Sequence, residues 1–410
     1  MKILVVGLGK LGLPLAAVLA NSGHSVLGYD RSIELVNTLN NNKFYSTEPG
    51  LVDLLNESKD LSFFSSVNLE MIENTEVIFV IVPTPSLENG AFSNEFILQA
   101  FFEIGPLLKL KHNKTAICIV STVMPGSCDV ELRNGLESVT GQTLGEKIGM
   151  CYHPEFIALG SVIYNLQNPD FHLLGVSNSW VSDLVEQVFK SITKTEVPCK
   201  KMSLLEAEIV KISVNNYITM KISFANSLLS LCDNFNDVDI NVITQAIGMD
   251  SRIGTKYLTA GAPYGGPCFP RDTRAMAKLF KDFSISSCYP DITSQINSNY
   301  TDFLVKKILN LTSKNDVIGI LGVSYKEGTP VIDESPGVLL SLALLKNGME
   351  VHTWDDENAK VPSYSIESHS LSQILDLCDF FVITRKTVEI EKIYNYIYLS
   401  NKNFIDLWSQ

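Results

Sequence analysis

Short apolar runs and helically spaced apolar residues alternate along the first third of the chain. An apolar run at 3–6 is followed by a helical pattern over 11–22 and by a second apolar run at 25–29. Further strands are expected at 77–82 and 115–120, which are rich in β-branched residues, and at 172–174. Because strands that alternate with helices form a parallel sheet covered on both faces, the pattern predicts a doubly wound α/β domain.

The middle of the chain is helical in pattern, and the last hundred residues return to alternating strands and helices. Apolar residues recur at helical spacing over 203–232, and a second helical section covers 238–247. A strand pattern at 317–321 precedes a helix pattern at 336–347 and a strand pattern at 350–354. The sequence therefore predicts an α/β protein in which two Rossmann-like doubly wound parallel-sheet domains are joined by a central helical domain.

Composition and charge narrow the class of protein. The 410 residues are 45% hydrophobic and 19% charged, which is typical of a globular chain. A net charge of −13 argues against nucleic acid as a partner, since a phosphate backbone requires a basic surface. The first apolar run is too short for a signal peptide, and no apolar run reaches the roughly 18 residues of a membrane span. Eight scattered cysteines without CxxC pairs indicate a reduced, cytoplasmic protein.

A glycine-rich motif follows the first predicted strand and begins the first predicted helix. Gly7, Gly9 and Gly12 form a GxGxxG pattern, which permits a tight turn and lets a pyrophosphate approach the helix N-terminus. Asp30 ends the second predicted strand, where a carboxylate accepts hydrogen bonds from ribose hydroxyls and repels a 2′-phosphate. The motif predicts NAD as the cofactor, and the neighbouring Arg31 leaves NADP as the alternative.

One cysteine lies in a segment that suits nucleophilic chemistry. Cys268 stands in a glycine-rich turn, four residues before the carboxylate of Asp272. A reactive thiolate requires an exposed, polar position of this kind. The other cysteines are expected to be small buried apolar residues, and they are Cys118, Cys128, Cys151, Cys199, Cys232, Cys288 and Cys378.

Several motifs, in order along the whole chain, resemble the UDP-glucose/GDP-mannose dehydrogenase family. They are Gly7-Leu-Gly-Lys-Leu-Gly-Leu-Pro14, Val82-Pro-Thr-Pro85, Ser121-Thr-Val-Met-Pro-Gly126, Pro154-Glu-Phe156, Glu206-Ala-Glu-Ile-Val-Lys211 with Asn215, Gly265-Gly-Pro-Cys-Phe-Pro-Arg-Asp272 and Leu321-Gly-Val-Ser-Tyr-Lys326. The Pro154-Glu-Phe156 and Asn168-Pro-Asp170 segments are most similar to the UDP-glucose branch of that family.

The resemblance implies a four-electron oxidation of the C6 alcohol of a nucleotide sugar to a carboxylate, with two NAD molecules used in turn. It implies that Cys268 traps the intermediate aldehyde as a thiohemiacetal, which a second hydride transfer converts into a thioester that water cleaves. It also implies three domains: NAD-binding at 1–198, helical at 199–300 with the catalytic cysteine and a dimer contact, and nucleotide-sugar-binding at 301–410.

The resemblance further implies roles for individual residues. Lys211 and Asn215 would stabilise the oxyanion at C6, Asp272 with Thr122 would hold the catalytic water or relay a proton, and Glu155 would be a further acid/base group. The cofactor contacts would be Gly7, Gly9, Lys10, Leu11, Gly12, Asp30, Arg31, Pro83, Thr84, Ser121 and Thr122. The substrate contacts would be Glu155, Phe156, Ile157, Ala158, Leu159, Lys211, Asn215, Arg252, Tyr257, Leu258, Gly265 and Lys326. Arg252 matches an arginine that reaches the neighbouring subunit's site in the family, which predicts a homodimer, and no metal is expected.

Two segments depart from the family's pattern. The family commonly carries Arg-Glu-Ser-Pro where this chain has Asp333-Glu-Ser-Pro336, so a carboxylate replaces a guanidinium that grips the diphosphate. After Pro154-Glu-Phe156 the family usually has a glutamate before a glycine, whereas this chain has Ile157-Ala-Leu-Gly160. We therefore expect intact oxidation machinery and modified substrate recognition.

Three other interpretations stay open on the residues alone. They are the same chemistry on another nucleotide sugar (GDP-mannose or a UDP-N-acetylhexosamine), a two-electron hydroxyacid dehydrogenase of the same domain plan, and a non-catalytic nucleotide-sugar binder. A hydroxyacid dehydrogenase uses its lysine and asparagine without a catalytic cysteine, so the Cys268 loop argues against it. The Asp333 segment permits the binder, but the joint presence of Cys268, Lys211, Asn215 and Asp272 argues against it.

Overall fold

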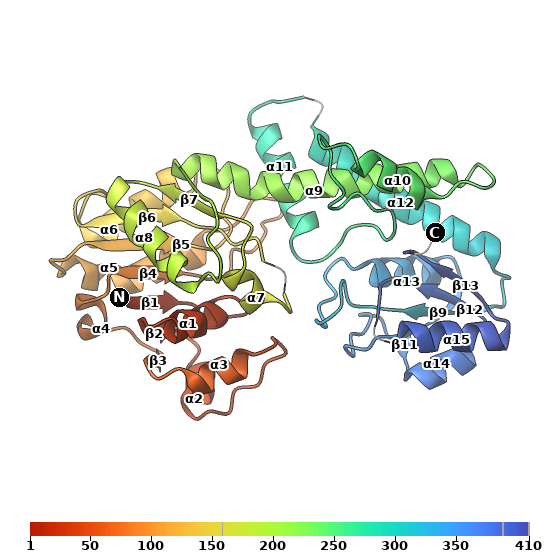
Figure 1. Ribbon diagram of the computed structural model, residues 1–410, viewed down its shortest axis with the longest axis horizontal. Coiled ribbons are helices and arrows are strands. Elements are labelled where there is room, and N and C mark those ends of the chain that lie inside the picture. The colour runs from red at the N-terminus through yellow and green to blue at the C-terminus, as the bar shows by residue number, and fades with distance from the viewer. Residues whose placement is uncertain (158, 287, 388, 409–410) are drawn as a thin grey trace. The chain divides into compact units, whose positions relative to one another are not determined.

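The computed structural model describes residues 1–157, 159–286, 288–387 and 389–408. The chain divides into two compact units, Met1–Lys211 and Ile212–Gln410, each built around one sheet (Figure 1). Among the helices in the described ranges, none has the length and uncharged apolar stretch that a bilayer crossing requires. The predicted α/β architecture with two largely parallel sheets is confirmed.

The first unit contains an eight-stranded sheet. Its strands are β1 Lys2–Val6, β2 Ser25–Tyr29, β3 Leu61–Phe64, β4 Val77–Val80, β5 Thr115–Ile119, β6 Ile148–Tyr152, β7 His172–Val176 and β8 Cys199–Met202. Their order is β3-β2-β1-β4-β5-β6-β7-β8, and β6 and β7 pair antiparallel while the other neighbours are parallel. This pair corrects the expectation of a wholly parallel sheet: the connection from β6 to β7 begins and ends at the same edge, so the chain re-enters the sheet in the opposite direction.

Helices cover both faces of this sheet. They are α1 Gly12–Asn21, α2 Ile33–Asn40, α3 Leu51–Glu57, α4 Leu69–Glu73, α5 Glu95–Lys109, α6 Arg133–Thr140, α7 Val162–Gln167 and α8 Ser179–Ile192, with a π-helical turn at Cys128–Leu132. Successive strand residues point to opposite faces, so Ile3 and Val5 join the core under α1, α7 and α8, while Leu4 and Val6 join the core under α4, α5 and α6.

One long helix, α9 (Leu204–Cys232), continues from the first unit into the second. Apolar spacing predicted this helix, but the helix buries polar side chains: Glu208, Asn216 and Thr219 are at most 1% exposed. Asn216 donates to the carbonyls of Ile212 (2.8 Å) and Asp272 (3.0 Å), which pairs both N–H groups of its buried amide. The helix therefore leaves part of its apolar surface exposed.

The second unit contains a five-stranded parallel sheet in the order β11-β10-β9-β12-β13. Its strands are β9 Val317–Leu321, β10 Glu350–Trp354, β11 Glu367–Ser368, β12 Phe380–Ile383 and β13 Asn403–Asp406. Its helices are α10 Ile240–Gly248, α11 Phe269–Asp282, α12 Tyr289–Leu311, α13 Pro336–Lys346, α14 Leu371–Leu377 and α15 Ile390–Ser400. The α12 and α13 helices pack on one face of this sheet, and α14 and α15 pack on the other (Figure 1). The predicted strands at 317–321 and 350–354 are confirmed.

Candidate active site

The glycine motif after β1 has the close packing of a dinucleotide-binding turn. Gly7 has φ +92°, and a Cβ on Gly7 would lie 2.2 Å from the carbonyl oxygen of Ile81. A Cβ on Gly12 would lie 1.9 Å from the carbonyl oxygen of Gly7, whereas one on Gly9 would meet nothing within 4 Å. The turn itself thus requires Gly7 and Gly12, while Gly9 leaves open space before α1 that fits a phosphate.

Asp30 lies at the carboxyl end of β2 and faces this turn. Its carboxylate accepts hydrogen bonds from the backbone N–H groups of Leu8 (2.8 Å) and Ser32 (2.9 Å). The Arg31 guanidinium lies 4.9 Å from the Phe96 ring centroid and donates to the Gln99 side chain (3.3 Å). The cation that would suit a 2′-phosphate is therefore held against α5, and the carboxylate stands at the turn, which favours NAD over NADP.

The predicted cofactor residues after β4 and β5 join two loops at one edge of the sheet. The Ser121 hydroxyl donates to the carbonyl of Val82 (2.7 Å) and accepts from its N–H (2.9 Å). The Thr84 hydroxyl donates to the carbonyl of Thr122 (2.7 Å). Because β4 lies beside β1, these contacts place the two loops at the strand edge that carries the glycine turn.

Lys211, on α9, contacts the Glu155–Phe156 segment. Its Nζ donates to the backbone carbonyl of Glu155 (2.8 Å) and lies 4.7 Å from the Phe156 ring centroid. The Glu155 side chain is 10% exposed, and burial raises its pKa to about 7, against a smaller opposing effect of the Lys211 charge. A carboxyl that titrates near neutral pH suits a general acid or base.

The segment after Phe156 has an apolar environment. Ile157 and Leu159 pack as partly buried side chains against the core under α1, α7 and α8. The predicted substrate residue Ala158 lies outside the described residues. This packing accounts for the apolar side chains that depart from the family's pattern here.

Glu208 lies within the Glu206-Ala-Glu-Ile-Val-Lys211 motif, but no role was predicted for it. It is fully buried on α9, and its carboxylate accepts hydrogen bonds from the N–H groups of Gly126 (2.6 Å) and Cys128 (2.8 Å). It therefore ties the loop after β5 to the helix that carries Lys211. An acidic residue three positions before Lys211, on the same side of a helix, is the feature that could have identified it.

Cys268 lies at the N-terminus of α11. Of the eight cysteines, all within the described part of the chain, Cys268 is exposed, Cys199 is intermediate and the other six are buried, as predicted for most of them. One turn along, Asp272 is 3% exposed and accepts a hydrogen bond from the Asn215 side chain (2.6 Å). The Asp272 N–H donates to the Cys268 carbonyl (2.8 Å). An exposed thiol at a helix N-terminus, close in sequence to a buried carboxylate, is suited to covalent catalysis.

The glycine loop before the cysteine rests on the segment that departs from the family's pattern. The Gly266 N–H donates to the Asp333 carbonyl (2.9 Å), and a Cβ on Gly265 would lie 2.1 Å from the carbonyl oxygen of Glu334. Glu334 has φ +46°, and its carboxylate forms two hydrogen bonds to Arg274 on α11 (2.7 and 3.1 Å). The 333–334 backbone therefore supports the cysteine loop, while the Asp333 side chain is exposed.

The other predicted substrate residues lie on separate segments of the second unit. Tyr257 has φ +62° and is half exposed, and the adjacent Leu258 is buried. Lys326 is partly buried in the loop after β9. Arg252 forms an ion pair with Asp250 (2.6 Å), and 85% of its side chain is exposed. The structure thus leaves Arg252 at the surface of its own chain.

The second unit repeats the glycine turn of the first at β9. A Cβ on Gly337, at the start of α13, would lie 2.2 Å from the carbonyl oxygen of Gly322. Asp355, after β10, accepts from the N–H of Val323 (2.6 Å) and pairs with the buried Arg385 (3.3 Å). The sequence motifs did not identify Arg385. Because a protein cation already binds the carboxylate that corresponds to Asp30, this turn differs chemically from the first.

Comparisons with known proteins agree with these features. Models of the UDP-glucose/GDP-mannose dehydrogenase family match residues 1–193 (NAD binding domain) and 205–299 (central domain). YtcA of Bacillus subtilis (strain 168) is 32% identical over 361 residues, which cover 87% of this chain and 82% of YtcA. The GDP-mannose 6-dehydrogenase of Pseudomonas aeruginosa is 28% identical over 361 residues, 87% of this chain and 81% of that protein.

A solved structure extends the likeness to the fold. The UDP-glucose dehydrogenase of the hyperthermophilic archaeon Pyrobaculum islandicum superposes with a TM-score of 0.87 at 28% identity, covering 95% of this chain and 90% of that chain. The chain therefore belongs to the UDP-glucose/GDP-mannose dehydrogenase family, whose dehydrogenases use NAD and act at C6 of nucleotide sugars.

Proposed function

We propose that this protein oxidises the C6 alcohol of UDP-glucose to the carboxylate of UDP-glucuronate, with Cys268 as a covalent catalyst. The observation that carries the proposal is the arrangement at the start of α11. There the exposed thiol of Cys268 lies one turn before the buried Asp272, which Asn215 binds at 2.6 Å. A two-electron hydroxyacid dehydrogenase has no use for such a thiol.

The first glycine turn fits a dinucleotide, and we assign it to NAD. Gly9 gives the pyrophosphate access to the start of α1, and Asp30 suits the ribose hydroxyls. When bound, NAD supplies the acceptor for a hydride from C6. The further contacts proposed for it are Lys10, Leu11, Arg31, Pro83, Thr84, Ser121 and Thr122.

The side chains of this protein would handle the protons and the carbon–sulfur bond. Lys211 and Asn215, one turn apart on α9, would stabilise the negative charge on the C6 oxygen as the alcohol loses its proton, which Glu155 accepts. The Cys268 thiolate then adds to C6 of the aldehyde, and the carbonyl oxygen gains a proton to give a thiohemiacetal. Loss of a second hydride from C6, for which a second NAD would be the acceptor, together with loss of the hydroxyl proton, yields a thioester.

Hydrolysis completes the proposed reaction. Asp272, with Thr122, would hold the water that adds to the thioester carbonyl and would accept a proton from it. The C–S bond then breaks, which returns the Cys268 thiolate and releases the carboxylate. A thiolate is a good leaving group, and this explains why sulfur is preferred to a serine oxygen at this position.

Substrate identity rests on fewer residues than the oxidation. We assign Lys326 to the diphosphate, and we assign Phe156, Tyr257, Leu258 and Gly265 to the sugar and its loop. The test is to measure kcat/KM for NAD reduction with UDP-glucose, UDP-galactose, UDP-N-acetylhexosamines and GDP-mannose. UDP-glucose should have the highest value. A higher value for another nucleotide sugar would change the assigned substrate but not the proposed oxidation.

Alanine at Gly9 should affect NAD binding, whereas alanine at Gly12 should affect stability. Gly9→Ala should leave the thermal unfolding midpoint unchanged, because its Cβ meets nothing, but should weaken NAD binding about tenfold or more by obstructing the phosphate. Gly12→Ala forces a Cβ against the Gly7 carbonyl and should lower the free energy of unfolding by about 1–3 kcal/mol. Thermal unfolding and NAD titration of both variants provide the check. Unchanged NAD affinity in Gly9→Ala would remove this turn from the cofactor site.

Restoring the family's arginine at position 333 should preserve activity. The Asp333 side chain is exposed and the segment contributes its backbone to the cysteine loop, so Asp333→Arg should fold normally. It should tighten UDP-glucose binding about 10- to 150-fold, the equivalent of about 1.5–3 kcal/mol for a charge-assisted hydrogen bond to the diphosphate. Asp302→Arg, which makes the same charge change at an exposed position of α12, is the control for calorimetric titration. A sharp fall in affinity would give Asp333 an active role in substrate recognition.

We also propose a homodimer formed through α9. Apolar side chains at helical spacing along this helix are 37–59% exposed, and they are Ile209, Tyr217, Met220, Phe224 and Leu231. These positions fall within one stripe of the helix, and a second copy related by a twofold axis offers the same stripe in return. Arg252 would then be the residue offered to the neighbouring subunit.

A further inference from the structure

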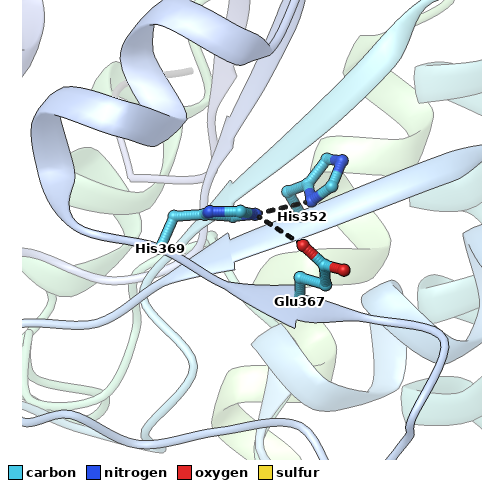
Figure 2. Close-up of side chains that lie close together, drawn as sticks. All are labelled: His352, Glu367 and His369. Atoms are coloured by element: carbon cyan, nitrogen blue, oxygen red, sulfur yellow. Dashed lines mark hydrogen bonds and ion pairs between the residues drawn. The ribbon is translucent and has the colours of Figure 1, made fainter.

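A group of side chains of the types that bind metal ions lies at the edge of the second sheet, and the proposed function uses none of them. His352 is on β10, its register partner Glu367 is on β11, and His369 follows directly after β11. Figure 2 shows the His369 ring pointing at both of the other side chains. One ligand atom from each residue lies within 4.8 Å of the others.

The separations of these atoms are those of a small metal site. His369 Nε2 lies 2.9 Å from His352 Nδ1 and 3.6 Å from a Glu367 carboxylate oxygen. In a tetrahedral zinc site with bonds of about 2.0–2.1 Å, neighbouring ligand atoms lie about 3.3 Å apart. The two observed separations bracket this value, and the third pair, His352 and Glu367, lies within 4.8 Å, so the Glu367 side chain would complete the site by moving toward His352.

A further carboxylate orients one of the two histidines. Glu350 Oε1 lies 3.1 Å from His352 Nε2, on the side of the ring opposite to His369. Because a carboxylate can only accept this hydrogen bond, Nε2 carries the proton and Nδ1 presents its lone pair to the cluster. Carboxylate–histidine pairs of this kind fix the tautomer of metal-binding histidines and make them stronger ligands.

The backbone holds the ligands in place without an ion. The His369 N–H donates to the Thr353 carbonyl (2.9 Å), and the Thr353 hydroxyl donates to the Glu367 carbonyl (3.3 Å). Both histidine side chains are about 15% exposed, whereas Glu367 is 72% exposed. The imidazoles are therefore preorganised, and the carboxylate is free to close on an ion that enters from solvent.

We propose that His352, Glu367 and His369 form a binding site for a divalent transition-metal ion, with zinc as the ion of choice and water in the fourth position. Two imidazoles favour zinc and its neighbours over magnesium or calcium, which prefer oxygen ligands. The ion would fasten the two-residue strand β11 to β10, and with it the connection over 355–366. That connection also holds the loop after β9, since Glu357 accepts a hydrogen bond from the Gly328 N–H (3.0 Å).

Zinc titration of the full-length chain, free of any histidine tag, tests the proposal. Calorimetry in the Cys268→Ser background, where the exposed thiol cannot compete, should show one Zn²⁺ per chain. His352→Gln and His369→Gln should each abolish binding at concentrations that saturate the parent, and Glu350→Gln should weaken it about 10- to 100-fold. His112→Gln, which changes an exposed histidine outside the cluster, should bind as the parent does.

Unfolding and spectroscopic measurements make the test independent of catalysis. Zinc should raise the thermal unfolding midpoint of the parent and of His112→Gln but not of the two cluster histidine variants. Cobalt should bind without a thiolate charge-transfer band, because the proposed ligands contain no sulfur. Equal zinc affinity in the parent and in His352→Gln and His369→Gln, or no saturable binding by the parent up to millimolar zinc, would overturn the proposal. Glu350→Gln changes an exposed side chain, so it keeps the test decisive even if a histidine variant fails to fold.

Discussion

Replacing Cys268 with serine should lower overall turnover by about 1,000-fold or more and leave substrate and NAD binding close to normal. In the proposed reaction the thiolate adds to an aldehyde that exists only after the first hydride has left, so the first half-reaction does not need it. A serine hydroxyl can form a hemiacetal, and loss of the second hydride then gives an ester. An ester releases its alcohol far less readily than a thioester releases a thiolate, so the variant should stall at a covalent intermediate.

Intact-protein mass spectrometry of Cys268→Ser after incubation with substrate and NAD measures this intermediate. The matched control is Cys199→Ser, because Cys199 is also partly exposed but lies on β8 and has no role in the proposed reaction. This control should turn over at the parent rate and carry no adduct. Normal turnover by Cys268→Ser would remove the thiol from the mechanism and favour the hydroxyacid dehydrogenase interpretation.

Glu155→Gln should slow the reaction about 100- to 10,000-fold, the usual contribution of a general acid or base. Burial raises the pKa of Glu155 to about 7, so in the wild type the pH profile of kcat/KM should show an inflection near pH 7. A glutamine cannot titrate, so the inflection should disappear in the variant. Glu146→Gln, at an exposed position, should preserve both the rate and the profile.

The same substitution should stabilise the protein at alkaline pH. The folded-state pKa of Glu155 lies above the ordinary value of 4.5, so the folded state binds this proton more tightly than the unfolded state does. Stability contributed by the protonated carboxyl is complete below about pH 4.5 and is lost as the pH rises through about 7. At pH 8 Glu155→Gln should therefore unfold at a higher denaturant concentration than the wild type, although its catalytic rate is lower. Higher stability with unchanged kinetics would reduce Glu155 to a structural residue.

Local patterns predicted the parts of the fold that local physics determines. The runs at 3–6 and 317–321 become strands because continuous β-branched and aliphatic residues suit a sheet buried on both faces. The strands at 25–29 and 350–354 each begin with an exposed polar residue and end in two buried residues. The β8 strand, Cys199–Met202, was not predicted, because its Cys-Lys-Lys-Met sequence is partly exposed and has no such run. The direction of β7 depends on how its connection returns to the sheet, which residue patterns do not encode.

In the candidate site, too, local sequence predicted some features, whereas others depend on contacts between distant residues. Motifs identified Gly7, Gly12, Cys268 and Asp272, because turn geometry and covalent chemistry restrict the residue types allowed at those positions. No role was predicted for the buried polar residues Glu208 and Arg385. Their roles depend on backbone N–H groups and carboxylates that lie far away in the sequence. The apolar spacing of α9 likewise predicted a helix but not which of its faces is buried.

The number of NADH molecules released per nucleotide sugar, measured together with the mass of the product, tests the proposed cysteine-dependent oxidation most directly. With UDP-glucose limiting and NAD in excess, the wild type should release two NADH per sugar and yield a product that has lost two hydrogens and gained one oxygen atom. Cys268→Ser, which is expected to stall at the ester, should stop releasing NADH after a single round at each active site. One NADH per sugar from the wild type, with a product that has lost two hydrogens and gained no oxygen, would contradict the proposed mechanism.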